Sequence, residues 1–389
     1  MADDAQREIE NSKELAKVVL NRDWAALPTE LLCLVLPQLF LRDVKRFHNV
    51  CRSWQDTPTP SIQSPVLMCI GNDNTRCKFF HPLYKDSHTM YIPELFGAVP
   101  RFSKDGWLLM SRGEYSIFFF NPFTKALINL PDLPNMYDFG GITFTSSPTS
   151  SDCMVFGINV QFDEWFSIST ICRGEESWQV LHGENNSPFF LSHCNPVFHH
   201  GEFYCLGQHG NLGVFNLDED YWRVLDKPHR QLLDPYLTHE RNFLVECNGE
   251  LLSVSMSSMG KLISVSKLDS VEMTWHKVDS LGDQMLFVSN TSSLSTKRVV
   301  QGMENKIYLP KIYEKCGVFY SLASRLFQTF GNDFSRKDWY GTGELLSCCW
   351  IEPKADTSYT KEELNWFEDA EPKADPSYSK EELNWFEDA

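Results

Sequence analysis

The stretch that decides the fold reads NPVFHHGEFYCLG (195–207), NLGVFNL (211–217) and YWRVLD (221–226). Apolar and polar residues alternate within each segment, and Gly, Asn and Asp separate the segments. That pattern is typical of short strands joined by tight turns. Trp222 stands near the end of the unit. The stretch therefore predicts a small antiparallel sheet.

Similar units recur along the chain, at residues 102–131, 142–181, 241–279 and 285–330. Trp178, Trp222 and Trp275 take equivalent places in three of the units, 44 and 53 residues apart. Four-stranded propeller blades repeat roughly every 40–50 residues, so the period favours a β-propeller. A β-sandwich would not need so many repeated units.

The two ends of the repeat region predict how the ring closes. Residues 66–94 contain VLMCI, CKFFHPLY and MYIPE, and SCCWIE follows only at 347–352. Together these segments can form one more blade, and such closure removes free sheet edges. We therefore expect a single, mainly all-β propeller of six blades, with seven as the alternative.

Upstream of the propeller, DWAALPTELLCLVLPQLFLRDVKRFHNVCRSWQ (23–55) has helical spacing. Its apolar stripe consists of Leu31, Leu32, Val35, Leu36 and Leu39. A second helix can begin at Asp43 and a third can carry Trp54. Three helices in about thirty residues cannot close a core alone. We expect an apolar face left for another protein; the alternative is that the helices pack on the C-terminal domain.

The order LPTELL (27–32), a spaced Leu/Val run, Asp43 and VCRSW (50–54) resembles the F-box, which docks substrate receptors on the Skp adaptor of SCF ubiquitin ligases. One departure is Pro37, which would kink or shorten the first helix. The resemblance implies that a set of residues is shared between the module's core and the adaptor groove: Leu27, Pro28, Leu31, Val35, Leu36, Leu39, Val50, Cys51 and Trp54.

The repeat region lacks the marks of WD or kelch blades, since no Trp-Asp ends a strand and the only Gly-Gly is at 140–141. It resembles instead the KIB-type (DUF295-like) β-propeller that follows plant F-boxes. The phrases that carry the resemblance are SKDGWLLM (103–110), NPFTKALINLP (121–131), HGEFYCL (200–206), FLVECNGELLSV (243–254), VDSLGDQMLFV (278–288) and CCWIEP (348–353).

The chain is therefore expected to consist of a disordered extension (1–20), an F-box (21–56), a Pro-rich linker (57–65), the propeller (66–352) and a disordered acidic tail (353–389). The tail belongs to a tandem duplication. EPKADTSYTKEELNWFEDA (352–370) returns as EPKADPSYSKEELNWFEDA (371–389). Each copy offers a short helix with a capping box, Thr360 with Glu363 or Ser379 with Glu382. The copies are either a linear docking motif or a duplication without a selected role.

The formal net charge of -17 disfavours binding to phosphate backbones, so we expect no nucleic-acid partner. No stretch is apolar enough to suggest a signal peptide or a membrane span. The twelve Cys lack CxxC spacing and are expected to be free thiols of a reducing compartment. These features predict a protein of the cytoplasm, the nucleus or both, without a membrane partner.

Catalytic motifs are missing: there is no G-x-S-x-G, H-E-x-x-H or paired CxxC, and Gly260-Lys261 is followed by Leu262 rather than Ser or Thr. The richest His/Cys stretch, 193–209, has no compact ligand pair. We expect no catalytic residue, no metal and no cofactor. A hydrolase using acidic residues of several blades around the central channel stays an alternative, because linear sequence does not reveal such a site.

The resemblance thus implies a non-catalytic subunit of an SCF-type ubiquitin ligase, with a Skp-type adaptor, and through it a cullin, as partners. The propeller would bind a protein substrate through loops between strands. Candidate loops surround Ser103–Trp107, Tyr137–Gly140, Gln161–Trp165 and Gly207–Asn211. An F-box-derived scaffold without ligase activity is the other alternative, motivated by Pro37.

Overall fold

The structure is a computed structural model. It describes residues 24–36, 46–57, 64–71, 75–82, 86–228, 241–256, 263–297, 301–313, 316–329, 348–353 and 358–367. Its contacts divide the chain into two compact units, Met1–Ile62 and Gln63–Ala389. No helix in the described ranges combines the length and the apolar character needed to cross a membrane.

The first unit is a small helical module. It contains the 3-10 helix η1 (Trp24–Ala26) and the helices α2 (Thr29–Val35) and α4 (Arg52–Gln55), and residues 46–48 are also helical. Its core consists of Leu32, Leu36 and Phe47, with Leu27 and Trp54 packed against them. Asp43, Pro37 and Leu39 lie outside the described residues, so the predicted second helix start and the kink are not tested.

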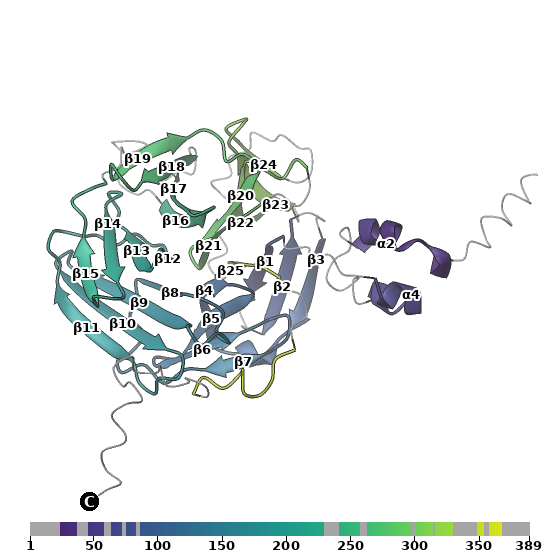
Figure 1. The fold of residues 1–389 in the computed structure, drawn as a ribbon, viewed down its shortest axis with the longest axis horizontal. Coiled ribbons are helices and arrows are strands. Elements are labelled where there is room, and N and C mark those ends of the chain that lie inside the picture. Colours follow the sequence, from purple (N-terminus) through teal and green to yellow (C-terminus); the bar gives the residue numbers. More distant parts are fainter. Residues whose placement is uncertain are drawn as a thin grey trace, which may run out of the picture. The chain divides into compact units, whose positions relative to one another are not determined.

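The second unit is a β-propeller of six sheets arranged in a ring (Figure 1). The six sheets formed by the described residues confirm the expected six blades, rather than seven. Blade 1 contains β1 (Val66–Ile70), β2 (Arg76–His81) and β3 (Asp86–Tyr91). Blade 2 consists of β4 (Ala98–Lys104), β5 (Trp107–Arg112), β6 (Ser116–Phe120) and β7 (Leu127–Asn129). Blade 3 consists of β8 (Gly141–Phe144), β9 (Met154–Gln161), β10 (Trp165–Cys172) and β11 (Gln179–Glu184). The short 3-10 helix η3 (Pro93–Leu95) leads from blade 1 to blade 2.

Blades 4 and 5 are regular four-stranded sheets as well. They consist of β12 (Val197–His199), β13 (Glu202–Leu206), β14 (Leu212–Asn216) and β15 (Tyr221–Val224), and of β16 (Arg241–Cys247), β17 (Glu250–Met256), β18 (Ile263–Asp269) and β19 (Thr274–Val278). Strands within each blade pair antiparallel in sequence order. This is the arrangement that the alternating pattern at 195–226 predicts.

Blade 6 departs from the four-stranded expectation. It has five strands in the order β21 (Ser292–Lys297), β20 (Gln284–Ser289), β22 (Lys306–Tyr313), β23 (Cys316–Ser321) and β24 (Leu326–Thr329). The hairpin β20–β21 turns back toward the channel, so that β20 pairs parallel with β22. An extra inner strand therefore completes this blade.

Blade 1 closes the ring with both ends of the propeller sequence. The last strand, β25 (Cys348–Ile351), pairs antiparallel with β1, with Val66 opposite Ile351 and Cys69 opposite Cys348. Thr291 of blade 6 adds a hydrogen bond from its hydroxyl to the carbonyl oxygen of Cys348, at 2.9 Å. The predicted closure is confirmed.

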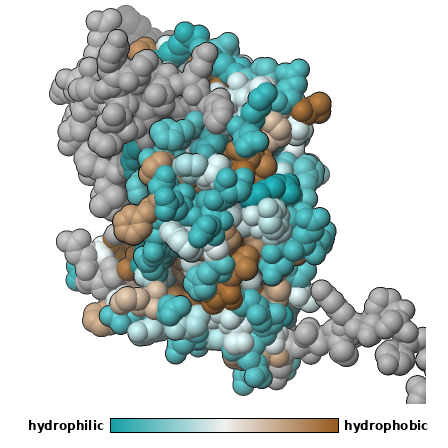
Figure 2. Space-filling model, turned by 90° about the vertical axis from the view of Figure 1, so that its left-hand side faces the viewer, coloured by the Kyte–Doolittle hydropathy of each residue, from teal (hydrophilic) through white to brown (hydrophobic). Residues whose placement is uncertain are grey.

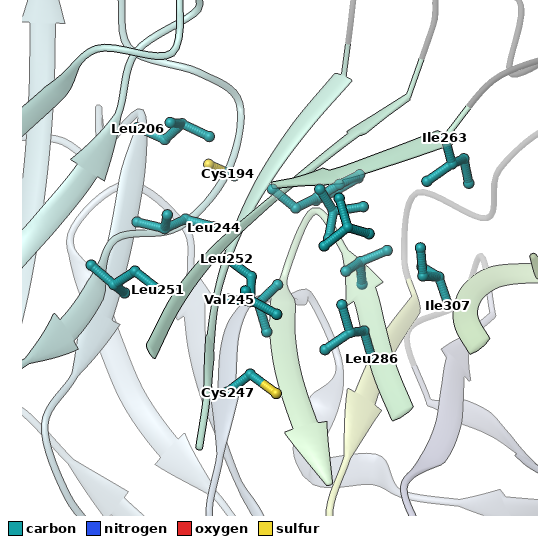
Figure 3. Packing of buried hydrophobic residues seen from close by; sticks show 14 of the residues in the cluster. Cys194, Leu206, Leu244, Val245, Cys247, Leu251, Leu252, Ile263, Leu286 and Ile307 are labelled. Carbon is teal, nitrogen blue, oxygen red and sulfur yellow. The ribbon is translucent and has the colours of Figure 1, made fainter. Parts of the chain in front are cut away.

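Neighbouring blades pack through apolar side chains on their facing surfaces. The largest cluster joins blades 4, 5 and 6, and Figure 3 shows Leu244 on one side of β16 and Val245, with Leu286, on the other. The repeated tryptophans bind blades 3, 4 and 5 each to the preceding blade. The indole nitrogen of Trp178 donates to the Pro131 carbonyl oxygen at 2.9 Å, Trp222 to Asn185 Oδ1 at 2.8 Å, and Trp275 to the Gly210 carbonyl oxygen at 2.7 Å.

The expectation of disorder for the whole acidic tail does not hold at residues 358–367. This segment lies against the propeller, where Trp366 is fully buried and Leu364 and Tyr359 are partly buried. The capping box of Thr360 and Glu363 forms, around a single turn rather than a helix. The tail's apolar residues explain the difference, because they give the segment enough surface to bury.

A buried histidine makes propeller stability depend on pH. His81 at the end of β2 is buried, and burial lowers its pKa from 6.5 to about 3. Between those values the unfolded chain binds the proton and the folded chain does not, so stability falls as the pH falls below about 6.5. At pH 5 the cost is about 2 kcal/mol. Thermal unfolding at pH 7 and pH 5 should show a smaller loss for His81→Gln than for the wild type. Equal losses in both proteins would contradict this assignment.

Candidate functional site

The helical module presents apolar side chains that it does not bury itself. Leu31, Leu34 and Val35 lie on α2, and their exposed fractions are 48%, 68% and 45%. Trp24 and Val50 are also largely exposed. Leu31, Leu34 and Val35 share one side of α2, which we call the outer apolar face. Five large apolar side chains on so small a unit indicate a surface for a protein partner.

The α2 helix separates this face from the core by its periodicity. Leu32 and Leu36 are one turn apart and point into the module, where they are buried beside Phe47. Leu31 and Val35, also one turn apart, lie on the other side and stay exposed. A partner can therefore bind to Leu31 and Val35 without disturbing the core.

Hydrogen bonds hold the ends of the module together. The indole nitrogen of Trp54 donates to the Trp24 carbonyl oxygen at 2.9 Å, and the Ser53 hydroxyl donates to the Ala25 carbonyl oxygen at 2.8 Å. The Trp54 ring packs on Phe47 with a centroid distance of 4.4 Å. Trp54 thus positions α4 against η1 and α2.

The nine residues predicted for adaptor binding fall into different places. Leu31, Val35, Val50 and Pro28 are exposed, Leu27, Cys51 and Trp54 are partly buried, Leu36 is in the core, and Leu39 lies outside the described residues. Sequence reasoning missed Trp24 and Leu34 as exposed apolar positions. Leu34 follows Leu31 by three residues, so helical spacing could have placed both on one face.

A cleft of about 420 Å³ lies on blade 3. The loop after β7 contributes Met136, Asp138 and Phe139 to its lining, and β9 and β10 contribute Gln161 and Trp165. The Asn159 amide donates to the Asp138 carboxylate at 2.7 Å, which fixes the loop over the sheet. The cleft thus brings together two of the four predicted candidate loops, Tyr137–Gly140 and Gln161–Trp165.

The turn between β9 and β10 displays two aromatic side chains beside this cleft. Phe162 and Asp163 have φ angles of 50° and 56°, in the left-handed region that disfavours bulky residues. Phe162 is nonetheless 85% exposed, and Trp165 is 49% exposed. A strained, exposed Phe is unfavourable for stability alone, so this turn is a candidate for contact with a partner. Figure 2 shows one side of the protein, where hydrophilic side chains predominate around smaller apolar groups.

The mouth of the central channel is a cavity of about 260 Å³, lined by both polar and apolar residues. All six blades contribute to its lining, and the inner strands surround it in Figure 1. Lys104 of β4 donates to the Thr145 carbonyl oxygen at 2.5 Å. Burial lowers the pKa of Lys104, while the carboxylates of Asp105, Glu246 and Glu352 oppose that shift. One amine and three carboxylates from different blades therefore lie near one another here.

The side-chain amide of Asn195 makes hydrogen bonds to other blades in the wall of the channel. Its nitrogen donates to the carbonyl oxygens of Arg101, at 3.0 Å, and Asn290, at 3.3 Å, and its oxygen accepts from the Ile142 backbone at 3.1 Å. These bonds join blades 2, 3 and 6. The role of Asn195 is therefore to hold the ring together.

The His/Cys stretch at 193–209 does not form a metal-binding cluster among the described residues. Cys194 and Cys205 are buried thiols, and burial raises the pKa of Cys194 to about 12 and that of Cys205 well above its usual value. The described ranges hold one group with metal-ligand spacing: Asp269, Glu272 and His276. Asp269 there accepts backbone hydrogen bonds from Val271 and Glu272, so the group caps an exposed turn.

Known proteins are similar to most of this chain. The family model of the KIB1-4 β-propeller matches residues 79–321. An F-box/kelch-repeat protein of Arabidopsis thaliana is 36% identical over 85% of this chain and 94% of its own length. Two F-box proteins of the same plant are each 31% identical, over 69% and 77% of this chain and 73% and 79% of their own lengths. The chain therefore belongs to the plant F-box proteins that carry a KIB1-4 β-propeller.

Proposed function

We propose that this chain is the substrate-recognition subunit of an SCF-type ubiquitin ligase. In this function the helical module docks on a Skp-type adaptor, which links it to a cullin, and the propeller binds a protein substrate. The observation that carries the proposal is the outer apolar face, on a module of an F-box protein too small to bury it.

Such a subunit contributes to ubiquitin transfer by positioning the substrate. A substrate held on the propeller stays close to a ubiquitin-loaded enzyme brought by the cullin, so the transfer becomes effectively intramolecular. The chain then needs no catalytic residue of its own. The F-box names of the relatives support this non-catalytic role.

Adaptor binding is tested with a plant Skp adaptor and the variant Leu31→Ala/Val35→Ala. Burying each of these side chains is worth about 1.5–3 kcal/mol, so the double variant should bind at least about 100-fold more weakly. Glu30→Ala, an exposed polar change on the same helix, should bind normally. The measurement is the dissociation constant by titration calorimetry.

The same titration decides between the ligase subunit and the scaffold without ligase activity. Circular dichroism must show that the variants stay folded. Wild-type protein that does not bind, with an adaptor that binds a control F-box, would leave the F-box-derived scaffold without ligase activity as the better proposal. Pro37 motivates that alternative, and Pro37→Ala would then restore binding.

The substrate surface that we favour is the blade 3 cleft with the β9–β10 turn. Exposed aromatic residues beside a cleft are typical anchors of protein interfaces. Proteins that co-purify with the full chain from plant cells should be lost in Phe162→Ala/Trp165→Ala. They should remain with Val271→Ala, which removes an exposed apolar side chain from a blade 5 turn. Quantitative mass spectrometry checks both, and an unchanged set of partners in the double variant would refute the assignment.

A propeller hydrolase is the second candidate, and the three carboxylates beside Lys104 in the channel mouth favour it. Its test is the hydrolysis of nitrophenyl esters, phosphates and glycosides by the full-length protein. On the ligase proposal, wild type and Glu246→Gln/Glu352→Gln should give the same background rate. Turnover that the double variant abolishes would support the hydrolase instead.

A further inference from the structure

The tail segment 358–367 is folded around one turn. The Thr360 backbone donates to Glu363 Oε2 at 2.7 Å, and the Glu363 backbone donates to Thr360 Oγ1 at 3.2 Å. The Leu364 backbone closes the turn by donating to the Thr360 carbonyl oxygen at 3.3 Å. This compact turn presents Tyr359, Leu364 and Trp366 together.

These three side chains enter a groove between blades 2 and 3. Trp366 is 1% exposed, and its ring stacks on Phe119 of β6 at a centroid distance of 5.8 Å. Tyr359 packs on Trp107 of β5 at 5.2 Å. The same apolar cluster includes side chains of β4, β8, β9 and β10. We call this surface the tail groove, formed by Trp107, Phe119, Arg173 and Gly174.

Arg173 and Gly174 hold the backbone of the tail. The buried Arg173 guanidinium donates through Nη2 to the carbonyl oxygens of Glu363, at 3.0 Å, and Asn365, at 2.9 Å. Its Nη1 donates to the Pro148 carbonyl oxygen, which fixes the side chain in place. The Gly174 amide donates to the Trp366 carbonyl oxygen at 2.9 Å. Backbone contacts combined with apolar anchors are how short linear motifs are commonly recognised.

The second tail copy repeats every residue that enters the groove. Tyr378, Leu383 and Trp385 correspond to the three anchors, and Ser379 with Glu382 repeats the capping box. Serine caps as well as threonine does. The copies differ otherwise only at Pro376, which corresponds to Thr357 before the docked segment. On chemistry alone the groove cannot distinguish the two copies.

Docking of the first tail copy leaves two buried hydrogen-bond donors without partners. Among the described residues, the indole nitrogens of Trp107 and Trp366 are buried without a hydrogen-bond partner. Each unpaired buried donor weakens the docked state. The segment is thus held by its anchors and by Arg173, but not as tightly as a core element.

We propose that the tail groove is an exchangeable binding site for a linear motif, and that the two tail copies of this chain compete for it. The tether from β25 to the second copy is about four times longer than the tether to the first copy. Loop-closure entropy therefore favours binding of the first copy by about eightfold. The second copy fills the groove when the first leaves. This site is independent of adaptor binding and of the proposed ligase function.

Hydrogen–deuterium exchange on the full-length chain tests the proposal. The readouts are the protection of peptides that contain the Gly174 amide and of peptides from 376–389. In Trp366→Ala the second copy should take the groove. The protection factor of the Gly174 amide should then stay within about tenfold of the wild-type value, because the longer tether of the second copy costs only about that much. The 376–389 peptides should gain protection. Trp366→Ala/Trp385→Ala should lose protection at Gly174 far beyond either single variant. Phe367→Ala, the exposed neighbour of the anchor, is the matched control and should behave as wild type.

Deleting residues 352–370 provides a second test that does not depend on a point variant. The deletion joins Ile351 to Glu371 and places the second copy in the register of the first, with Pro and Ser as the only changes. Gly174 should be protected as in the wild type. Loss of protection in this chain, or a loss in Trp366→Ala as complete as in the double variant, would overturn the proposal.

Discussion

The propeller depends on one constraint: each blade is apolar on both faces. Residues on the two faces of β9, such as Phe156 and Val155, are both buried, and they belong to clusters shared with different neighbouring blades. A sheet of this kind is stable only between two others, so the blades must form a closed ring. The pairing of β25 with β1 meets that requirement, and the tryptophans Trp178 and Trp222 add a polar fastening at the blade rims.

Much of this arrangement could be predicted from local patterns. Period-two alternation located the strands, and the spacing of Trp178, Trp222 and Trp275 reflects a shared place in the blade. Helical spacing identified α2, although it did not say which of Leu31 and Leu32 would be buried. That choice depends on where Phe47 and Trp54 lie, which is a tertiary contact.

Other features could not be predicted, for physical reasons. The parallel pairing of β20 with β22 arises because the β20–β21 hairpin folds toward the channel, and nothing in the alternation of either strand encodes that direction. The docking of Trp366 was missed because acidic composition outweighed three well-spaced apolar residues. The blade 3 cleft joins two loops that are distant in sequence, so neither loop alone could be ranked.

The strands of blade 3 also keep two surfaces apart. Trp165 at the start of β10 borders the cleft, and Arg173 just beyond its end lies in the tail groove. Eight residues of extended chain separate them by about 25 Å. A docked tail therefore leaves the cleft open, and one blade can serve two binding events at opposite ends.

The long sequence separation between β1 and its partner β25 has a consequence for biosynthesis. The ribosome makes β1 before the strands of blades 2 to 6 and β25 after them, so this edge of β1 stays unpaired while those blades are made. Unpaired edges of this kind invite pairing with other chains. A chain that ends before residue 348 would lack β25, so the edge of β1 would stay unpaired and open to pairing with other chains.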